Sequence, residues 1–236
     1  MDNINSKLIC RLREVEKRFE RNASPVLFSI SLNLYSGQVL GVRGENGAGK
    51  STLLSAIAGV CRITGGSIEY AEGIKKSISY LPQELSLYDD LSGNANLNFY
   101  GIASGTPLKE LKPQRERLLK ELNLTDKAKI KVEKYSGGMK RRLHLATALM
   151  RTPKLLLLDE PTANLDPEGV QQVRDAVVQA VTATGATLIV VEHRVGVWAQ
   201  HMDRVIVLGA DGGITHDGAP ETVLAQARET LIADGI

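Results

Sequence analysis

A glycine-rich loop between a buried strand and a helix is the feature that most constrains the fold of this chain. Residues 38–42 form an apolar run typical of a strand buried on both faces, and residues 52–58 have the pattern of a helix. Between them, Gly-Glu-Asn-Gly-Ala-Gly-Lys-Ser completes the phosphate-loop pattern. A strand, a loop and a helix in this order bring backbone amides and the positive end of the helix to one point. We therefore predict a binding site for phosphates.

The side chains of this loop have the chemistry to hold a nucleoside triphosphate. Glycines allow the backbone to wrap the phosphates, Lys50 is expected to contact the β and γ phosphates, and Ser51 to bind Mg²⁺. A glycine-rich turn with a purely structural role is the alternative, which the complete pattern disfavours. The residues predicted to bind the nucleotide here are Gly44, Glu45, Asn46, Gly47, Ala48, Gly49, Lys50, Ser51 and Thr52.

Four consecutive leucines, residues 155–158, precede a pair of carboxylates. The run is too short to cross a membrane and is typical of a central strand in a parallel sheet. Because ligands of open α/β sheets gather at the carboxyl ends of strands, we expect Asp159 in the Mg²⁺ shell and Glu160 beside the water that attacks the γ-phosphate. Glu160 is then the general base or positions the water. A solvated acidic turn is the alternative if the phosphate loop is ignored.

A third motif, Tyr-Ser-Gly-Gly-Met at residues 135–139, lies between these two. Ser136 is a good helix N-cap, and the glycines permit close backbone approach. With this motif the chain resembles the ATP-binding subunit of an ABC transporter, although Tyr135 and Met139 replace the leucine and glutamine most common in that family. The resemblance implies that the motif contacts ATP held by the phosphate loop of a second subunit. Its expected ATP-binding residues are Ser136, Gly137, Gly138 and Met139.

Shorter matches to the family follow in the family's own order. Gln83 comes after the apolar run 78–82, and the resemblance implies that it contacts Mg²⁺ and the catalytic water. His193 follows the strand-like run 187–192, and the resemblance implies a hydrogen bond to the γ-phosphate. Asp166 stands where the family makes a contact across the dimer interface, but a plain helix N-cap is equally compatible with its position.

Two further features have competing interpretations. Phe19 is the candidate for stacking on adenine, because the family places an aromatic residue about this far before the phosphate loop; a core or surface phenylalanine is the alternative. Lys140, Arg141 and Arg142 fall in the first turn of a predicted helix, where cations oppose the helix dipole. We interpret each of these three cations as part of a solvated basic face rather than as a phosphate contact.

Composition limits the remaining function classes. The chain is 43% hydrophobic and 24% charged, which is typical of one globular domain or a domain with a subdomain. No stretch approaches a membrane span, and the amino terminus lacks a secretory pattern, so we expect a cytoplasmic protein, held peripherally at the membrane by its partner. A net charge of +2 without long runs of one sign gives no indication of nucleic-acid binding. Cys10 and Cys61 fit neither a metal cluster nor a disulfide framework.

The expected fold class is α/β, with a P-loop NTPase (RecA-like) core, a small antiparallel β-subdomain and an inserted α-helical subdomain. All three belong to a single ABC ATP-binding domain over residues 1–236. The β-subdomain is expected at about 7–36, the nucleotide-binding core at about 37–83 and 153–236, and the helical signature subdomain at about 84–152.

The alternation in residues 26–35 predicts a strand with one exposed side, paired antiparallel with residues 8–15. On this pattern the buried face is expected to contain Phe28, Ile30, Leu32 and Leu34.

The resemblance also implies two kinds of partner. A second ABC subunit is expected to join head to tail around ATP and Mg²⁺, as a homodimer or heterodimer. A transmembrane permease is expected to dock on the region from Gln83 to Leu91, which resembles the corresponding stretch of many exporters, with Leu87, Tyr88 and Leu91 lining a groove. A helix that packs only on its own subdomain is the alternative there.

The predicted function is ATP hydrolysis coupled to movement of a substrate by the membrane partner, with export favoured over import. A soluble regulatory ABC ATPase, which uses an ATP-dependent dimer clamp without transport, is the leading alternative. A module that binds nucleotide without turnover is disfavoured by the presence of both Glu160 and His193.

Overall fold

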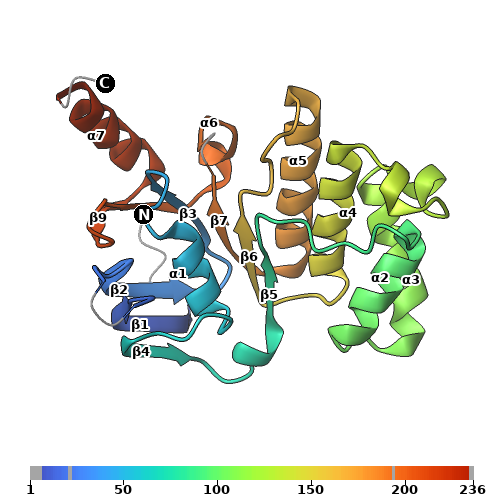
Figure 1. Cartoon of the computed structure of the whole chain (residues 1–236), viewed down its shortest axis with the longest axis horizontal. Coiled ribbons are helices and arrows are strands. Elements are labelled where there is room, and N and C mark those ends of the chain that lie inside the picture. The colour runs from blue at the N-terminus through green and yellow to red at the C-terminus, as the bar shows by residue number, and fades with distance from the viewer. Residues whose placement is uncertain (1–6, 21–22, 193–194, 234–236) are drawn as a thin grey trace.

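The computed structural model describes residues 7–20, 23–192 and 195–233. Figure 1 shows three parts side by side, with the larger sheet in the middle. At one end lie the strands β1 (Leu8–Lys17), β2 (Leu27–Tyr35) and β4 (Gly65–Tyr70), and at the other end the helices α2 (Gly93–Ala103) and α3 (Leu108–Glu121). The part of the chain that the structure describes contains no helix long and apolar enough to cross a membrane.

The larger sheet has the strand order β5-β6-β7-β3-β8-β9. Its neighbouring strands are parallel except for β8 and β9, which form an antiparallel hairpin whose turn contains Asp211, Gly212 and Gly213. Strands β6 and β7 are buried along their whole length, as expected for central strands covered on both faces. The strands are β3 (Val39–Gly44), β5 (Ile78–Leu81), β6 (Leu155–Asp159), β7 (Thr187–Val191), β8 (Arg204–Leu208) and β9 (Ile214–Gly218).

The leucines of β6 divide between two hydrophobic cores on opposite faces of this sheet. Leu156 and Leu158 belong to the core shared with the helical subdomain. Leu155 and Leu157 belong to the core shared with α1 and the small sheet. This division follows from the alternation of side chains along a strand, and it explains why four consecutive positions of a central strand are leucine.

The smaller sheet is antiparallel, with the order β2-β1-β4. It consists of β1 (Leu8–Lys17), β2 (Leu27–Tyr35) and β4 (Gly65–Tyr70). The predicted pairing of residues 8–15 with residues 26–35 is confirmed. The third strand comes from residues that the sequence analysis assigned to the nucleotide-binding core, so this sheet reaches beyond the expected range of 7–36.

The alternation predicted for β2 breaks at Ser29. Ser29 has a left-handed backbone with φ 48°, and the register with β1 shifts in this part of the strand pair. Leu27 is fully buried and Phe28 is 46% exposed, whereas Ile30 and the leucines after it are buried. The prediction that Phe28 joins the buried face is therefore wrong, because a β-bulge moves the residues before Ser29 to the opposite face.

Helix α5 follows its sequence signals closely. The carboxylate of Asp166 accepts a 2.8 Å hydrogen bond from the amide of Gly169, which confirms the predicted N-cap. Gly185, with φ 65°, ends the helix in the left-handed conformation. Val170 and Val173 lie on the buried face of the helix.

The remaining helices cover the two faces of the parallel sheet or form the helical subdomain. The α-helices are α1 (Lys50–Ile57), α2 (Gly93–Ala103), α3 (Leu108–Glu121), α4 (Gly137–Leu149), α5 (Pro167–Thr184), α6 (Val195–Trp198) and α7 (Pro220–Ala233). Short 3₁₀ turns are η1 (Lys75–Ser77), η2 (Thr125–Lys127), η3 (Val132–Lys134) and η4 (Ala199–His201). Leu111 and Leu118 of α3 are buried in the core of the helical subdomain.

Candidate nucleotide-binding site

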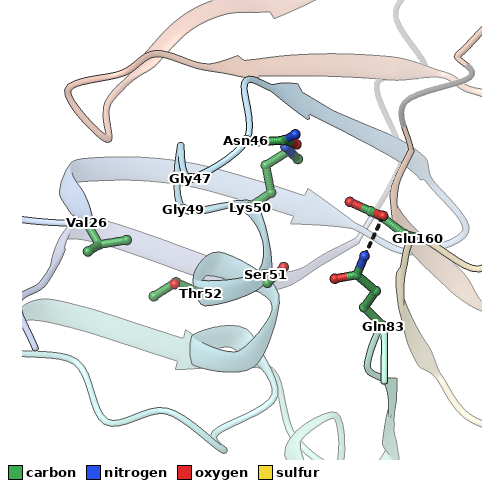
Figure 2. A pocket seen from close by; sticks show the side chains of 9 residues that line it. All are labelled: Val26, Asn46, Gly47, Gly49, Lys50, Ser51, Thr52, Gln83 and Glu160. Carbon is green, nitrogen blue, oxygen red and sulfur yellow. Dashed lines mark hydrogen bonds between the residues drawn. The ribbon is translucent and has the colours of Figure 1, made fainter. Parts of the chain in front are cut away.

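The phosphate loop joins β3 to α1 and borders a cavity of about 450 Å³. Figure 2 shows that the loop lies opposite Gln83 and Glu160, which come from the ends of two other strands. The structure therefore brings together residues that are far apart in the sequence. The cavity is lined by Val26, Asn46, Gly47, Gly49, Lys50, Ser51, Thr52, Gln83 and Glu160.

Two glycines of the loop have left-handed backbones, Gly47 with φ 87° and Gly49 with φ 91°. A Cβ atom on Gly49 would lie 2.5 Å from the carbonyl oxygen of Val26, whereas one on Gly47 would meet no atom within 4 Å. Glycine is favoured at both positions by its conformational freedom, and at Gly49 also by close packing against the small sheet.

Lys50 is buried, and its ammonium group lies against the loop itself. Nζ donates hydrogen bonds of 2.8 Å to the carbonyl oxygens of Gly44 and Glu45. Burial lowers the pKa of Lys50, while the nearby carboxylates of Glu160 and Asp159 act in the opposite direction. The loop thus holds a cation at the edge of the cavity, where it could bind phosphate oxygens.

Asp159 ends β6 and is only 2% exposed. Burial raises its pKa, and a hydrogen bond from the Ser51 hydroxyl opposes that shift. Oδ1 of Asp159 is buried and has no hydrogen-bond partner among the described residues. A carboxylate oxygen of this kind beside a serine hydroxyl fits Mg²⁺, which is bound by few protein ligands together with water and phosphate.

Gln83 and Glu160 are in direct contact. Nε2 of Gln83 donates a 2.8 Å hydrogen bond to Oε2 of Glu160, shown as the dashed line in Figure 2. Glu160 has a left-handed backbone with φ 47°, and its amide donates a 3.0 Å hydrogen bond to the carbonyl oxygen of Val191. The proposed catalytic carboxylate is therefore held in an uncommon backbone conformation at the cavity.

Arg141 was not predicted as a site residue, yet its guanidinium lies directly behind the cavity. The residue is 5% exposed and donates to the carbonyl oxygens of Gln83, Glu160 and Pro161. The interpretation of Arg141 as a solvated cation is wrong, because the helix turns this position inward and main-chain carbonyls replace water. A signal was present: Arg141 precedes buried Leu145 by four residues, the spacing of one helix face.

The neighbouring cations of α4 have side-chain partners. Lys140 forms a 2.8 Å ion pair with Asp89, and Nη1 of Arg142 donates a 2.7 Å hydrogen bond to Gln172. Neither Lys140 nor Arg142 lines the cavity.

Glu192 is a second buried residue that the sequence analysis did not select. It is 5% exposed and accepts hydrogen bonds from the amide of Thr162, at 3.0 Å, and from the Thr162 hydroxyl. These bonds connect the turn after Glu160 to the end of β7.

The signature residues lie at the start of α4. The Ser136 hydroxyl accepts a 3.3 Å hydrogen bond from the amide of Met139, as expected for an N-cap. Ser136 and Gly137 are exposed, and no signature residue lines the cavity. This arrangement leaves the motif accessible to another molecule.

Phe19 and His193 are the last two predicted site residues, and only Phe19 lies among the described residues. Phe19 is 67% exposed and does not line the cavity, and the Lys17 ammonium lies 4.9 Å from the centre of its ring. His193 lies outside the described residues. Val26, in contrast, was not predicted; it lies immediately before β2 of the small sheet and borders the cavity.

Comparison with protein families agrees with this geometry. A family model described as ABC transporter matches residues 27–163, a range that includes the phosphate loop, the signature and the carboxylates of Asp159 and Glu160 at the end of β6. This chain belongs to the ABC transporter family. Its ATP-binding domains are ATPases of the P-loop type, so the expected fold class is confirmed.

Relatives from the ABC transporter family match most of the chain. Linearmycin resistance ATP-binding protein LnrL of Bacillus subtilis (strain 168) is 39% identical over 176 residues, covering 71% of this chain and 56% of the relative. Methionine import ATP-binding protein MetN of Nocardia farcinica (strain IFM 10152) is 34% identical over 230 residues, covering 92% of this chain and 69% of the relative. The chain thus spans little more than half the length of the first of these two ABC proteins.

A solved ABC transporter structure has the same fold. The structure of cbiO1 from Clostridium perfringens, described as part of the ABC transporter complex cbiONQ, superposes with a TM-score of 0.81 at 27% identity. The match covers 93% of this chain and 92% of that protein.

Proposed function

We propose that this chain is the ATP-binding and ATP-hydrolysing subunit of a transporter, coupling head-to-tail dimerisation driven by Mg²⁺ and ATP to substrate movement by a separate membrane subunit. The observation that carries the proposal is the convergence of Lys50, Gln83 and Glu160 on one cavity, with the buried carboxylate of Asp159 beside Ser51. Positioning and electrostatic stabilisation are what phosphoryl transfer requires from a protein.

In this mechanism Lys50 and the loop amides hold the β and γ phosphates. The hydroxyl of Ser51 and the carboxylate of Asp159, with the amide of Gln83, would hold Mg²⁺, which when bound neutralises phosphate charge. Glu160 orients the attacking water and accepts its proton.

A second subunit is part of the proposal because the signature lies apart from the chain's own cavity. Ser136, Gly137, Gly138 and Met139 would bind the γ-phosphate side of the nucleotide held by the other subunit. Asp166 would contribute across the same interface besides capping α5, and His193 would contact the γ-phosphate. Phe19, being exposed, is available to stack on adenine.

The proposed permease surface lies on the segment that follows Gln83. Tyr88 is 47% exposed and Leu91 38% exposed, while Leu87 is partly buried against the core. Tyr88 and Phe99 pack edge to face with ring centres 4.8 Å apart, which extends the apolar surface onto α2. An exposed apolar patch suits a protein partner. We accordingly place the chain at the cytoplasmic face of a membrane, held there by its partner.

Export is the proposed direction of transport. It rests on the exporter-like segments around Gln83 and Ser136, while the names of similar proteins include both a resistance protein and a methionine importer. Transport by reconstituted vesicles with the membrane partner would test the direction: accumulation of substrate on the side of the ATPase would overturn it.

The central experiment compares wild type with Glu160→Gln, which keeps the size of the side chain and removes the carboxylate. We expect Mg²⁺-dependent ATP hydrolysis in the wild type and a loss of about 10²–10⁴-fold in the variant. The variant should accumulate as a dimer when ATP is added, measured by light scattering. A variant that hydrolyses ATP at the wild-type rate would contradict the role of Glu160. Function without any recoverable membrane partner would favour the regulatory ATPase instead.

A further inference from the structure

We propose that Arg141 is a positioning residue for hydrolysis, which holds Gln83 and the turn containing Glu160 in one fixed arrangement. The inference rests on the proposed role of Glu160. Arg141 itself does not line the cavity, so it would act through these two residues rather than by touching the nucleotide.

The three hydrogen bonds of the guanidinium connect two separate segments. Nη1 donates to the carbonyl oxygen of Gln83 at 2.5 Å, Nη2 to that of Glu160, and Nε to that of Pro161 at 3.1 Å. Because the guanidinium is planar and rigid, donors bound on both sides fix the relative position of the segments. All three acceptors are main-chain oxygens, which leaves the side chains of Gln83 and Glu160 directed to the cavity.

The backbone of Glu160 shows why such support is needed. Its left-handed conformation, φ 47°, is one that a residue with a side chain keeps only when its surroundings hold it. The amide of Glu160 is bound to the carbonyl oxygen of Val191, and the carbonyl of Glu160 is bound by Arg141. Strand β7 therefore fixes one side of this residue. Arg141 fixes the other, together with the amide of Ala163, which donates a 3.1 Å hydrogen bond to the same carbonyl oxygen.

The guanidinium of Arg141 stays charged although it is buried, because arginine is not deprotonated in proteins. Burial lowers the pKa of Arg141, while the carboxylates of Glu192, Glu160 and Asp159 raise it. A buried cation among carboxylates is stable when its donors are satisfied, and here three carbonyls satisfy them. An apolar substitution would remove this donor from all three oxygens, and the Glu160 oxygen would keep its 3.1 Å hydrogen bond from the amide of Ala163.

Variants of Arg141 can separate positioning from packing. Methionine fills similar space without a donor, glutamine offers two N–H donors without charge, and lysine keeps the charge without the planar group. We expect Arg141→Met to lower kcat about 100-fold, the effect of misplacing a reacting group by about 1 Å. Arg141→Gln and Arg141→Lys should fall between Met and wild type. The KM for ATP and ATP binding should change by less than about threefold, since the phosphate loop is untouched.

Lys140→Gln is the matched control, because it removes a cation from the same helical turn whose partner, Asp89, is largely exposed. It should keep wild-type kcat. Melting temperatures are measured for every variant. Two results would show that Arg141 acts only through side-chain packing. One is an equal kcat for the Met and Gln variants, and the other is a loss of kcat in proportion to the loss of melting temperature. If Arg141→Met does not fold, the Gln and Lys variants decide: wild-type kcat in either one overturns the proposal.

A combined variant distinguishes this inference from the proposed function. Arg141→Met with Glu160→Gln should still form the ATP-dependent dimer, and it should hydrolyse no more slowly than Glu160→Gln alone, because both changes act on the same step. If the wild type fails to hydrolyse ATP and Glu160→Gln fails to dimerise, the proposed function is wrong. If both behave as expected and Arg141→Met has wild-type kcat, only the positioning role is wrong.

Discussion

The amide of Gln83 is hydrogen-bonded to the carboxylate of Glu160 at 2.8 Å, although 77 residues separate them. The contact follows from topology: β5 pairs in parallel with β6, so the residues after both strands emerge at the same edge of the sheet. In this arrangement Gln83 occupies an acceptor position of the carboxylate that is proposed to orient water. Catalysis would therefore require the two side chains to separate or to share the water between them.

Gln83→Glu would place a second carboxylate at hydrogen-bonding distance from Glu160. Two close carboxylates cannot both ionise easily, and one pKa rises. We expect the ascending limb of the kcat–pH profile to move to higher pH by about one unit or more. Gln83→Ala is the control: it should lower kcat and move the limb less than Gln83→Glu does, because it removes one hydrogen bond to the carboxylate and adds no charge. If the kcat–pH profiles of the two variants have the same midpoint, residue 83 does not contact Glu160 during turnover.

Gly49→Ala should destabilise the protein more than Gly47→Ala. Both substitutions put a side chain on a left-handed backbone, which costs about 1–2 kcal/mol. Only at Gly49 does the new Cβ overlap a carbonyl oxygen, that of Val26, and overpacking adds about 1–3 kcal/mol. Urea unfolding of the two variants measures the difference. Equal losses would mean that the small sheet can move away from the loop.

Thr162→Val tests the bond between Thr162 and the buried carboxylate of Glu192. The substitution keeps the shape of the side chain and removes a donor to a charged group, so we expect the free energy of unfolding to fall by about 1.5–3 kcal/mol. Thr162→Ser keeps the hydroxyl and loses only a methyl group, which costs about 1 kcal/mol. Urea titrations at neutral pH compare them. A serine variant as unstable as the valine variant would show that packing, not the hydroxyl, matters here.

Local sequence signals predicted the elements that depend on local physics. The leucine run of β6 and the Asp166 cap of α5 each depend on a few neighbouring residues, and the structure confirms them. The strand β2 was predicted, but the side of Phe28 was wrong, because a bulge depends on the partner strand rather than on the alternation itself. Strand β4 has too little alternation to be recognised without β1 beside it.

The residues of the candidate site also divide into those that local motifs predict and those that only the packing of the fold reveals. The phosphate loop and the carboxylate pair are contiguous motifs, so residues such as Lys50 and Glu160 could be selected from the sequence alone. Arg141 and Val26 acquire their positions only when separate elements pack, Arg141 through α4 and Val26 through the small sheet. A buried arginine is also rare enough that composition argues against it until its carbonyl partners are seen.

The buried imidazole of His144 should make the folded protein less stable in acid. It is 2% exposed; burial, together with the charge of Arg141, lowers its pKa to about 4. Its Nε2 accepts a long hydrogen bond from the amide of Ser86, at 3.4 Å, and Nδ1 has no partner among the described residues. The folded state therefore holds this imidazole neutral at a pH where the unfolded chain would protonate it.

The sign and the size of this pH effect on stability follow from the pKa of His144 in the unfolded chain, 6.5, and in the folded protein, about 4. Between pH 6.5 and about 4 the unfolded state binds one more proton at this residue, so acidification favours unfolding by about 1.4 kcal/mol per pH unit, or roughly 3 kcal/mol in total. Above pH 6.5 the contribution is constant. Urea unfolding from pH 7.5 to 5 should show the wild type losing stability faster than His144→Gln, which cannot titrate. The difference between the two curves isolates His144 from the carboxylates that titrate in both proteins. Parallel curves over this range would mean that the imidazole is protonated in the folded state, and that α4 opens to water at this residue.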